Sequence, residues 1–140
     1  MKKLAVVYWT STGNTEGMAD ALIEGSLQIS SDVVKIPVSQ FDINTVNEYD
    51  VFAFGCPAMG EEQLDEYEFE PMFNSVLPLL VGKEVALFGS YGWGDGEWMN
   101  RWVETCVSNG ITPIQTIIAN YTADETIIEE LKQLGIKLVS

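Results

Sequence analysis

Apolar residues gather in five short runs, at residues 4–9, 33–38, 51–54, 85–88 and 114–119. Uninterrupted apolar runs of this length are typical of strands buried on both faces, as in a parallel sheet. The run at 33–38 alternates instead, and Pro37 has no N–H to donate to a neighbouring strand. We therefore expect five strands, with the second at an edge of the sheet.

Between these runs, apolar residues recur at helical spacing. The pattern predicts a helix from residue 15 to about 27, a second over residues 69–80, a third around residues 99–106 and a fourth around residues 127–134. Pro78 should kink or end the second helix, and Asp124 is placed to cap the fourth. A further short helix is expected within residues 43–47.

Strands that alternate with helices predict an α/β fold with helices on both faces of the sheet. Right-handed crossovers then allow a doubly wound five-stranded parallel sheet in the order 2-1-3-4-5. No linker or repeat divides the chain, so we expect residues 1–140 to form a single domain. Ligands of such sheets bind beyond the carboxyl ends of strands one and three, which places the site just after residues 9, 55 and 89.

The chain is strongly acidic, with a formal net charge of −14 and no basic residue between Lys35 and Lys83. Such a field repels nucleic acid and anionic membranes and attracts basic partners. Composition alone is equally compatible with a surface that only keeps the protein soluble. The crowding of acidic residues favours a docking surface; these residues are Glu61, Glu62, Asp65, Glu66, Glu68 and Glu70.

The chain has no histidine, which removes the commonest general base and most zinc, copper and non-haem iron sites. Cys56 and Cys106 have no metal-like spacing, so neither a metal site nor a disulfide scaffold is expected. No run approaches the roughly 20 apolar residues of a membrane span. The apolar run after Lys3 is too short for a signal peptide. We therefore expect a cytoplasmic protein that does not enter membranes.

Three loops carry candidate chemistry, and the first follows the first strand. It reads Thr10, Ser11, Thr12, Gly13, Asn14 and Thr15. Because it opens a helix, its free backbone N–H groups and the positive helix end can bind an anion. It has no lysine, which argues against a P-loop and favours a terminal monophosphate held by neutral donors. An ordinary hydroxyl-rich cap and turn is an equally good interpretation of this loop alone.

The second and third loops supply surfaces for a flat ligand. In the loop Cys56, Pro57, Ala58, Met59, Gly60, Glu61 and Glu62, no arginine follows Cys56 at phosphatase spacing. Its informative residues are a polarizable Met59 and a Gly60 that can change its peptide orientation. The loop Ser90, Tyr91, Gly92, Trp93, Gly94 and Asp95 sets two aromatic residues among glycines. These suit stacking on a ligand, although aromatics folded back over the sheet are the alternative.

Together, in this order and at these strand ends, the three loops resemble those of the short-chain flavodoxins over nearly the whole chain. The resemblance implies a flavodoxin-like fold and one non-covalently bound FMN. It also implies a monomeric low-potential one-electron carrier, not an enzyme, that cycles between semiquinone and hydroquinone. The implied partners are redox enzymes with basic docking surfaces, such as ferredoxin-type donors and acceptors.

The resemblance also implies residue roles. The hydroxyls of Thr10, Thr12 and Thr15 and the backbone N–H groups of residues 11–15 would hold the phosphate. Met59 and Trp93 would enclose the isoalloxazine ring. Tyr91 would lie close by, Glu62 would accept from the flavin N3–H, and Asp95 would add negative charge. The backbone around Ala58, Gly60, Ser90 and Gly92 would contact the ribityl chain and the ring edge. Pro57, Glu61 and Gly94 complete the expected cofactor-binding set, but Pro57 cannot donate an N–H, so a phosphate or ribityl contact there would come from its neighbours.

Three other functions are compatible with parts of this pattern. A response-regulator receiver needs an acidic pair after strand one and an aspartate at the end of strand three, and neither Tyr8-Trp9-Thr10 nor Gly55-Cys56 supplies them. A small FMN-dependent quinone reductase shares the expected fold and cofactor. A flavoprotein dedicated to activating one enzyme, of the ribonucleotide-reductase-activating type, also stays open.

Overall fold

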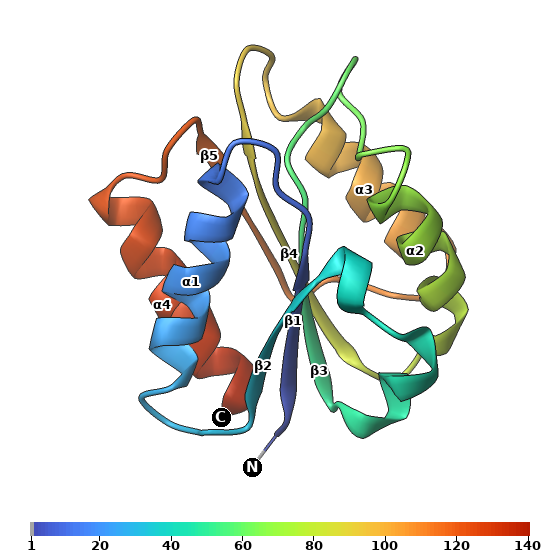
Figure 1. Cartoon of the computed structure of the whole chain (residues 1–140), viewed down its shortest axis with the longest axis vertical. Helices are drawn as coiled ribbons and strands as arrows, with labels where there is room; N and C mark the ends of the chain where they lie inside the picture. The colour runs from blue at the N-terminus through green and yellow to red at the C-terminus, as the bar shows by residue number, and fades with distance from the viewer. Residues whose placement is uncertain (1) are drawn as a thin grey trace.

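The computed structural model describes residues 2–140 and contains a five-stranded parallel sheet (Figure 1). The strands run in the order β2-β1-β3-β4-β5, as predicted, which places β2 at an edge. Their bounds are Leu4–Tyr8 for β1, Val33–Pro37 for β2, Val51–Gly55 for β3, Glu84–Tyr91 for β4 and Gln115–Asn120 for β5. Every residue of β1 and β3 is buried, which explains why their sequences lack polar alternation.

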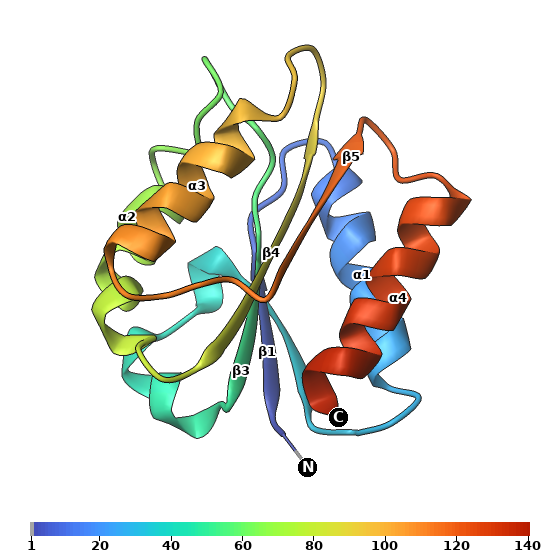
Figure 2. The ribbon, with the colours of Figure 1, turned by 180° about the vertical axis from the view of Figure 1, so that it is seen from behind.

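Helices cover both faces of the sheet (Figures 1 and 2). Helices α1 (Asn14–Ser26) and α4 (Glu125–Val139) lie on one face, and α2 (Phe69–Val76) and α3 (Glu97–Ser108) lie on the other. Pro78 ends α2 as expected, since a short 3-10 helix, η3 (Leu77–Leu79), replaces its last turn. The predicted helix near residue 43 is a 3-10 helix, η2 (Ile43–Glu48), and η1 (Val38–Gln40) follows β2.

Helices α1 and α4 approach each other closely because each carries a glycine at their contact. A Cβ at Gly25 would overlap the Lys132 carbonyl, and a Cβ at Gly135 would overlap the Leu22 carbonyl. The cap of α4 is the predicted one, because the Asp124 carboxylate accepts from the Ile127 N–H at 2.9 Å. The helix pair therefore forms a firm support under one face of the sheet.

Strand β4 extends three residues beyond the predicted apolar run at 85–88. Its pairing with β5 continues to Tyr91↔Asn120, and the Ala58 N–H donates to the Ser90 carbonyl at 2.9 Å on the other side. Gly89 permits this because a Cβ there would overlap the Cys56 carbonyl. The extension carries β4 past the end of β3 and holds the loops after both strands together.

Candidate functional site

The three loops singled out in the sequence meet beyond the carboxyl ends of the strands, at the top of Figure 1. Two adjoining cavities lie between them, and both are lined by Ala58, Met59 and Gly92. The first, of about 180 Å³, is further lined by Ser11, Thr12, Asn14, Pro57, Ser90, Tyr91 and Tyr121. The second, of about 240 Å³, is completed by Gly60, Glu62 and Trp93. The observed site thus unites residues from four of the five strand ends.

The β1–α1 loop turns into its helix through Gly13, whose φ of 96° is left-handed and favours glycine. The Thr10 hydroxyl oxygen accepts from the Gly13 N–H at 3.0 Å and so tightens the turn. Within residues 2–140, no side chain caps the start of α1. The first N–H groups of this helix and its positive dipole end are consequently available to an anion.

Two of the expected phosphate-binding hydroxyls are used inside the protein. Thr15 is buried, and its hydroxyl lies 2.8 Å from the Ser90 hydroxyl, which joins the first loop to the third. Thr10 closes its own turn, as described above. From this loop, Ser11, Thr12 and Asn14 line the cavity, and Ser11 and Thr12 are the hydroxyl-bearing residues among them. The loop therefore separates residues that shape it from residues that face the cavity.

The β3–α2 loop makes a tight reversal after Met59. Met59 and Gln63 exchange two backbone hydrogen bonds, of 2.7 and 3.0 Å, and enclose three turn residues. Two of these have left-handed backbone angles, with φ of 53° at Gly60 and 57° at Glu62. Arg101 on α3 donates to the carbonyls of Glu61 and Glu62, at 3.3 and 3.1 Å. The turn therefore contains a strained non-glycine residue, Glu62, and Arg101 holds the turn against α3.

The Glu62 carboxylate reaches the start of α3. One of its oxygens accepts from the Trp98 N–H at 2.7 Å, which satisfies a free donor in the first turn of the helix. Its other oxygen occupies the space where a Cβ at Gly94 would lie. The carboxylate therefore links the second loop to the third, and Glu62 is also one of the residues that line the second cavity. That it accepts from a flavin N3–H stays a prediction.

The two aromatic residues of the β4–α3 loop behave differently. The Trp93 side chain is 82% exposed and lines the second cavity, as expected for a displayed ring. Tyr91 follows the alternative of a ring folded back onto the protein, because it packs against buried Trp98 with centroids 5.6 Å apart. Tyr91 still contributes to the wall of the first cavity. Trp93 alone of this pair offers a free aromatic face.

Asp65 does not belong to the acidic surface that the sequence suggested. The residue is only 5% exposed, and one carboxylate oxygen accepts from the N–H groups of Glu68 and Phe69, at 2.8 and 2.9 Å. Asp65 thus provides the hydrogen-bond acceptor for two backbone N–H groups at the start of α2. Glu61 and Asp95 are exposed and stand within two residues, along the chain, of residues that line the second cavity, and Glu66 is exposed farther along the same loop as Glu61; these three residues form what we call the acidic rim.

The two cysteines are free and buried, and both pack in the hydrophobic core as small apolar residues. Burial raises the pKa of the Cys56 thiol well above its ordinary range and raises the pKa of Cys106 to about 11. Both therefore remain protonated at neutral pH and lack the thiolate that a nucleophile or metal ligand requires. Among residues 2–140, no group of three His, Cys, Asp or Glu side chains is placed to hold a metal.

The cavities do not include every predicted residue, and they include one that the sequence analysis missed. The predicted residues that line neither cavity are Thr10, Gly13, Thr15, Glu61, Gly94 and Asp95. The missed residue is Tyr121, in the loop after β5. No motif singled it out. The available sequence signal was its position directly after a parallel strand, at the edge where ligands bind.

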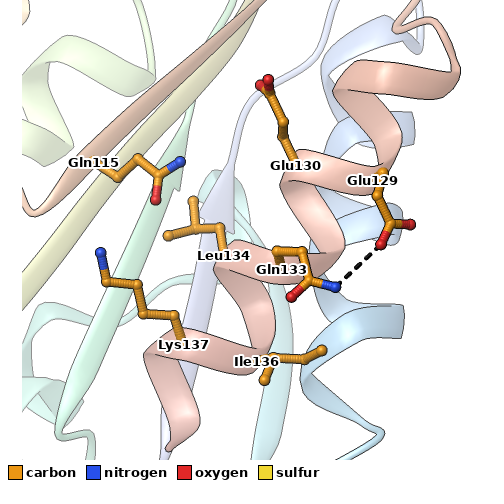
Figure 3. Close-up of a pocket in the computed structure, with 7 residues that line it drawn as sticks. All are labelled: Gln115, Glu129, Glu130, Gln133, Leu134, Ile136 and Lys137. Carbon is orange, nitrogen blue, oxygen red and sulfur yellow. Dashed lines mark hydrogen bonds between the residues drawn. The ribbon is translucent and has the colours of Figure 1, made fainter.

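A larger cavity, of about 440 Å³, lies away from these loops between α4 and the start of β5 (Figure 3). Its walls are Gln115 on β5 and, on α4, Glu129, Glu130, Gln133, Leu134, Ile136 and Lys137. A hydrogen bond of 3.1 Å joins Gln133 to Glu129 along the helix. No strand-end loop and no backbone strain contribute to it. The convergence of loops, and not cavity size, identifies the candidate site.

Comparison with known proteins agrees with this geometry. Residues 6–111 match the sequence model of the flavodoxin family. The chain is 42% identical to flavodoxin from Megasphaera elsdenii over 93% of both chains, and 42% identical to flavodoxin from Clostridium beijerinckii over 87% of this chain and 89% of the other. The solution structure of two-electron reduced Megasphaera elsdenii flavodoxin superimposes with a TM-score of 0.88 at 40% identity, covering 96% of this chain and 98% of that one. The chain belongs to the flavodoxin family, and it is an FMN-binding electron-transfer protein rather than an enzyme.

Proposed function

We propose that this chain carries single electrons between larger redox enzymes on one FMN, held non-covalently across the two adjoining cavities. The phosphate end would lie in the first cavity, and the isoalloxazine ring would lie in the second. The observation that carries this proposal is that Ala58, Met59 and Gly92 line both cavities, which places the two cavities side by side. The two cavities differ in chemistry as the two ends of FMN do.

The first cavity suits a phosphate that is bound without a counter-charge. The uncapped start of α1 offers backbone N–H groups, and Ser11 and Thr12 add hydroxyls. Such hydrogen bonds to an anion are each worth roughly 1.5–3 kcal/mol. Asn14 also lines this cavity, and its side chain accepts from the Thr122 hydroxyl at 3.3 Å. These groups would bind and orient the phosphate.

The second cavity suits a flat aromatic ring. Trp93 presents an exposed indole, and the half-buried Met59 presents a polarizable thioether at the same cavity. Ring stacking and sulfur contacts of this kind each contribute about 0.5–1.5 kcal/mol beyond burial. When bound, FMN supplies the one-electron chemistry. The residues of the chain would enclose the ring, exclude water from its faces and surround it with negative charge.

The acidic rim fits partners with basic docking surfaces. Glu61, Glu66 and Asp95 are exposed on the two loops that would hold the ring, and the formal net charge of the chain is −14. Opposite charge steers association and raises the encounter rate, most strongly at low salt. We infer partners among redox enzymes of the ferredoxin-dependent type, and we propose a cytoplasmic monomer. No helix in residues 2–140 is long and apolar enough to cross a membrane.

An anaerobic reductive titration of the purified protein tests the proposal. We expect a flavin absorbance spectrum, release of FMN on denaturation and two resolved one-electron steps. Steady-state oxidation of nicotinamide cofactors by quinones should stay at the background rate. A single two-electron step together with rapid quinone turnover would instead assign the chain to the quinone reductases. A released flavin other than FMN would contradict the cofactor assignment.

A further inference from the structure

Backbone strain singles out two residues. Glu62 and Tyr121, both with φ of 57°, are the non-glycine residues with positive φ among residues 2–140. This conformation is unfavourable for side chains with a Cβ, and for a bulky aromatic residue it is a genuine outlier. Strain of this kind collects at ligand sites, where the surrounding structure enforces it. Each of these residues lines one of the two adjoining cavities.

The loop after β5 is fastened on both sides of Tyr121. The backbone N–H of Tyr121 donates to the Tyr91 carbonyl at 2.7 Å, and the side-chain amide of Asn120 donates to the Gly92 carbonyl at 2.8 Å. On the other side, the Thr122 hydroxyl donates to the Asn14 side chain at 3.3 Å. These bonds tie the loop to both the β4–α3 loop and the β1–α1 loop. The left-handed backbone of Tyr121 is therefore imposed by its neighbours.

The Tyr121 ring lies against Gly92. A Cβ at Gly92 would lie 3.3 Å from the ring and 3.6 Å from the hydroxyl oxygen, which is tighter than an ordinary contact on the ring side. The absence of a side chain at Gly92 thus lets the ring approach the backbone that both cavities share. The side chain is nevertheless 59% exposed, so the protein itself does not bury it. Its ring and hydroxyl remain available at the first cavity.

We propose that Tyr121 is a further cofactor-contacting residue of this chain. Its ring would close the open side of the first cavity, and its hydroxyl would donate to an oxygen of the ribityl phosphate chain of FMN. A tyrosine hydroxyl both donates and accepts, which suits either a phosphate oxygen or a ribityl hydroxyl. This inference rests on the proposed binding of FMN across the two cavities.

Calorimetric titration of the apoprotein with FMN and with riboflavin tests the role of Tyr121. Tyr121→Phe should raise the Kd for FMN several-fold, and Tyr121→Asn should raise it about tenfold or more. Asparagine tolerates left-handed angles, so the Tyr121→Asn apoprotein should unfold at the same temperature as the parent or at a higher one. A weakening by Tyr121→Phe that is confined to FMN assigns the hydroxyl to the phosphate. An equal weakening with riboflavin assigns it to the ribityl chain.

Tyr67→Phe provides the matched control, because Tyr67 is 83% exposed and lines neither cavity. Its Kd for FMN should equal that of the parent. Unchanged FMN affinity in both Tyr121 variants, with a less stable Tyr121→Asn apoprotein, would overturn the inference and leave Tyr121 a purely structural residue. If the parent itself bound no FMN, the proposed function would fall and this inference with it, so the two failures are distinguishable.

Discussion

The β1–α1 and β3–α2 loops line the same site but are built in opposite ways. The first carries hydroxyl side chains, has one left-handed glycine and ends on an uncapped helix. The second is acidic, has left-handed angles at both Gly60 and Glu62 and is held by Arg101 from α3. The first loop can bind an anion with its backbone. The second loop places strain and negative charge beside the proposed ring.

This contrast suggests that the two loops have separate roles in one cofactor site. Hydrogen bonds to a phosphate do not depend on the redox state of the ring, so the first loop would set affinity. Negative charge and an adjustable turn act differently on each redox state, so the second loop would set the potentials. Each of the following experiments changes one side of this comparison and leaves the other side in place.

The largest effect should come from removing the phosphate. Riboflavin lacks the group that the first loop would bind, and several charge-assisted hydrogen bonds of roughly 1.5–3 kcal/mol each would be lost. We therefore expect riboflavin to bind orders of magnitude more weakly than FMN in a calorimetric titration of the apoprotein. Equal affinities would show that the first loop does not bind the phosphate, and would contradict the separate roles proposed for the two loops.

A structural effect is expected at Asp65, which the sequence alone groups with the acidic rim. Asp65→Ala leaves the N–H groups of Glu68 and Phe69 without their acceptor and should lower the free energy of unfolding by about 1–2 kcal/mol. Chemical denaturation of the apoprotein measures this loss. Glu66→Ala, at an exposed position of the same loop, should change stability by less than about 0.5 kcal/mol. Equal losses of unfolding free energy in the two variants would show that Asp65 contributes no more to stability than the exposed Glu66.

A smaller effect, specific to one redox state, is expected at Gly60. The peptide carbonyl at this turn would accept from a protonated N5 of one-electron-reduced FMN, and this hydrogen bond would contribute about 0.5–1.5 kcal/mol. Gly60→Thr should lose more affinity for one-electron-reduced FMN than for oxidised FMN, since a β-branched residue resists the turn. Gly60→Asn is the matched variant, because asparagine tolerates the observed φ of 53°. Equal losses in both redox states would reduce Gly60 to a turn residue.

The smallest effect is expected from the acidic rim. A carboxylate about 10 Å from the ring opposes an anionic reduced flavin by about 0.4 kcal/mol in water-like surroundings. A tenfold change in a one-electron equilibrium corresponds to about 59 mV. The double variant Glu61→Gln, Glu66→Gln should therefore raise the reduction potential of the second one-electron step by tens of millivolts. Higher salt should shrink this shift. Potentiometric titration at two ionic strengths measures it.

The charge-matched control for that pair lies on α4. Replacing Glu129 and Glu130 with glutamine removes the same charge at the cavity shown in Figure 3, away from the cofactor loops. This variant should leave the potential unchanged within a few millivolts at moderate salt, where screening acts over about 10 Å. Equal shifts in both double variants would mean that only net charge matters, and not the acidic rim.

Much of the fold could be predicted because its determinants are local. Buried strands such as β1 read as continuous apolar runs, Pro37 marks the edge strand, and Pro78 ends α2. The three site loops were recognisable because glycine, hydroxyl and aromatic residues stand directly after such strands. The extent of β4 was not predictable in this way, because its last residues are held by pairing with β5 and by a bond from Ala58.

The sequence by itself therefore determined the order of elements and the edge at which the site forms. Only the tertiary structure decided the roles of Asp65, Glu62 and Tyr121. Asp65 is buried against α2, Glu62 reaches the start of α3, and the neighbouring loops force Tyr121 into a left-handed conformation. The physical reason is that local patterns fix which face is buried, whereas the partner of a polar or strained residue is chosen by chain segments far away in sequence.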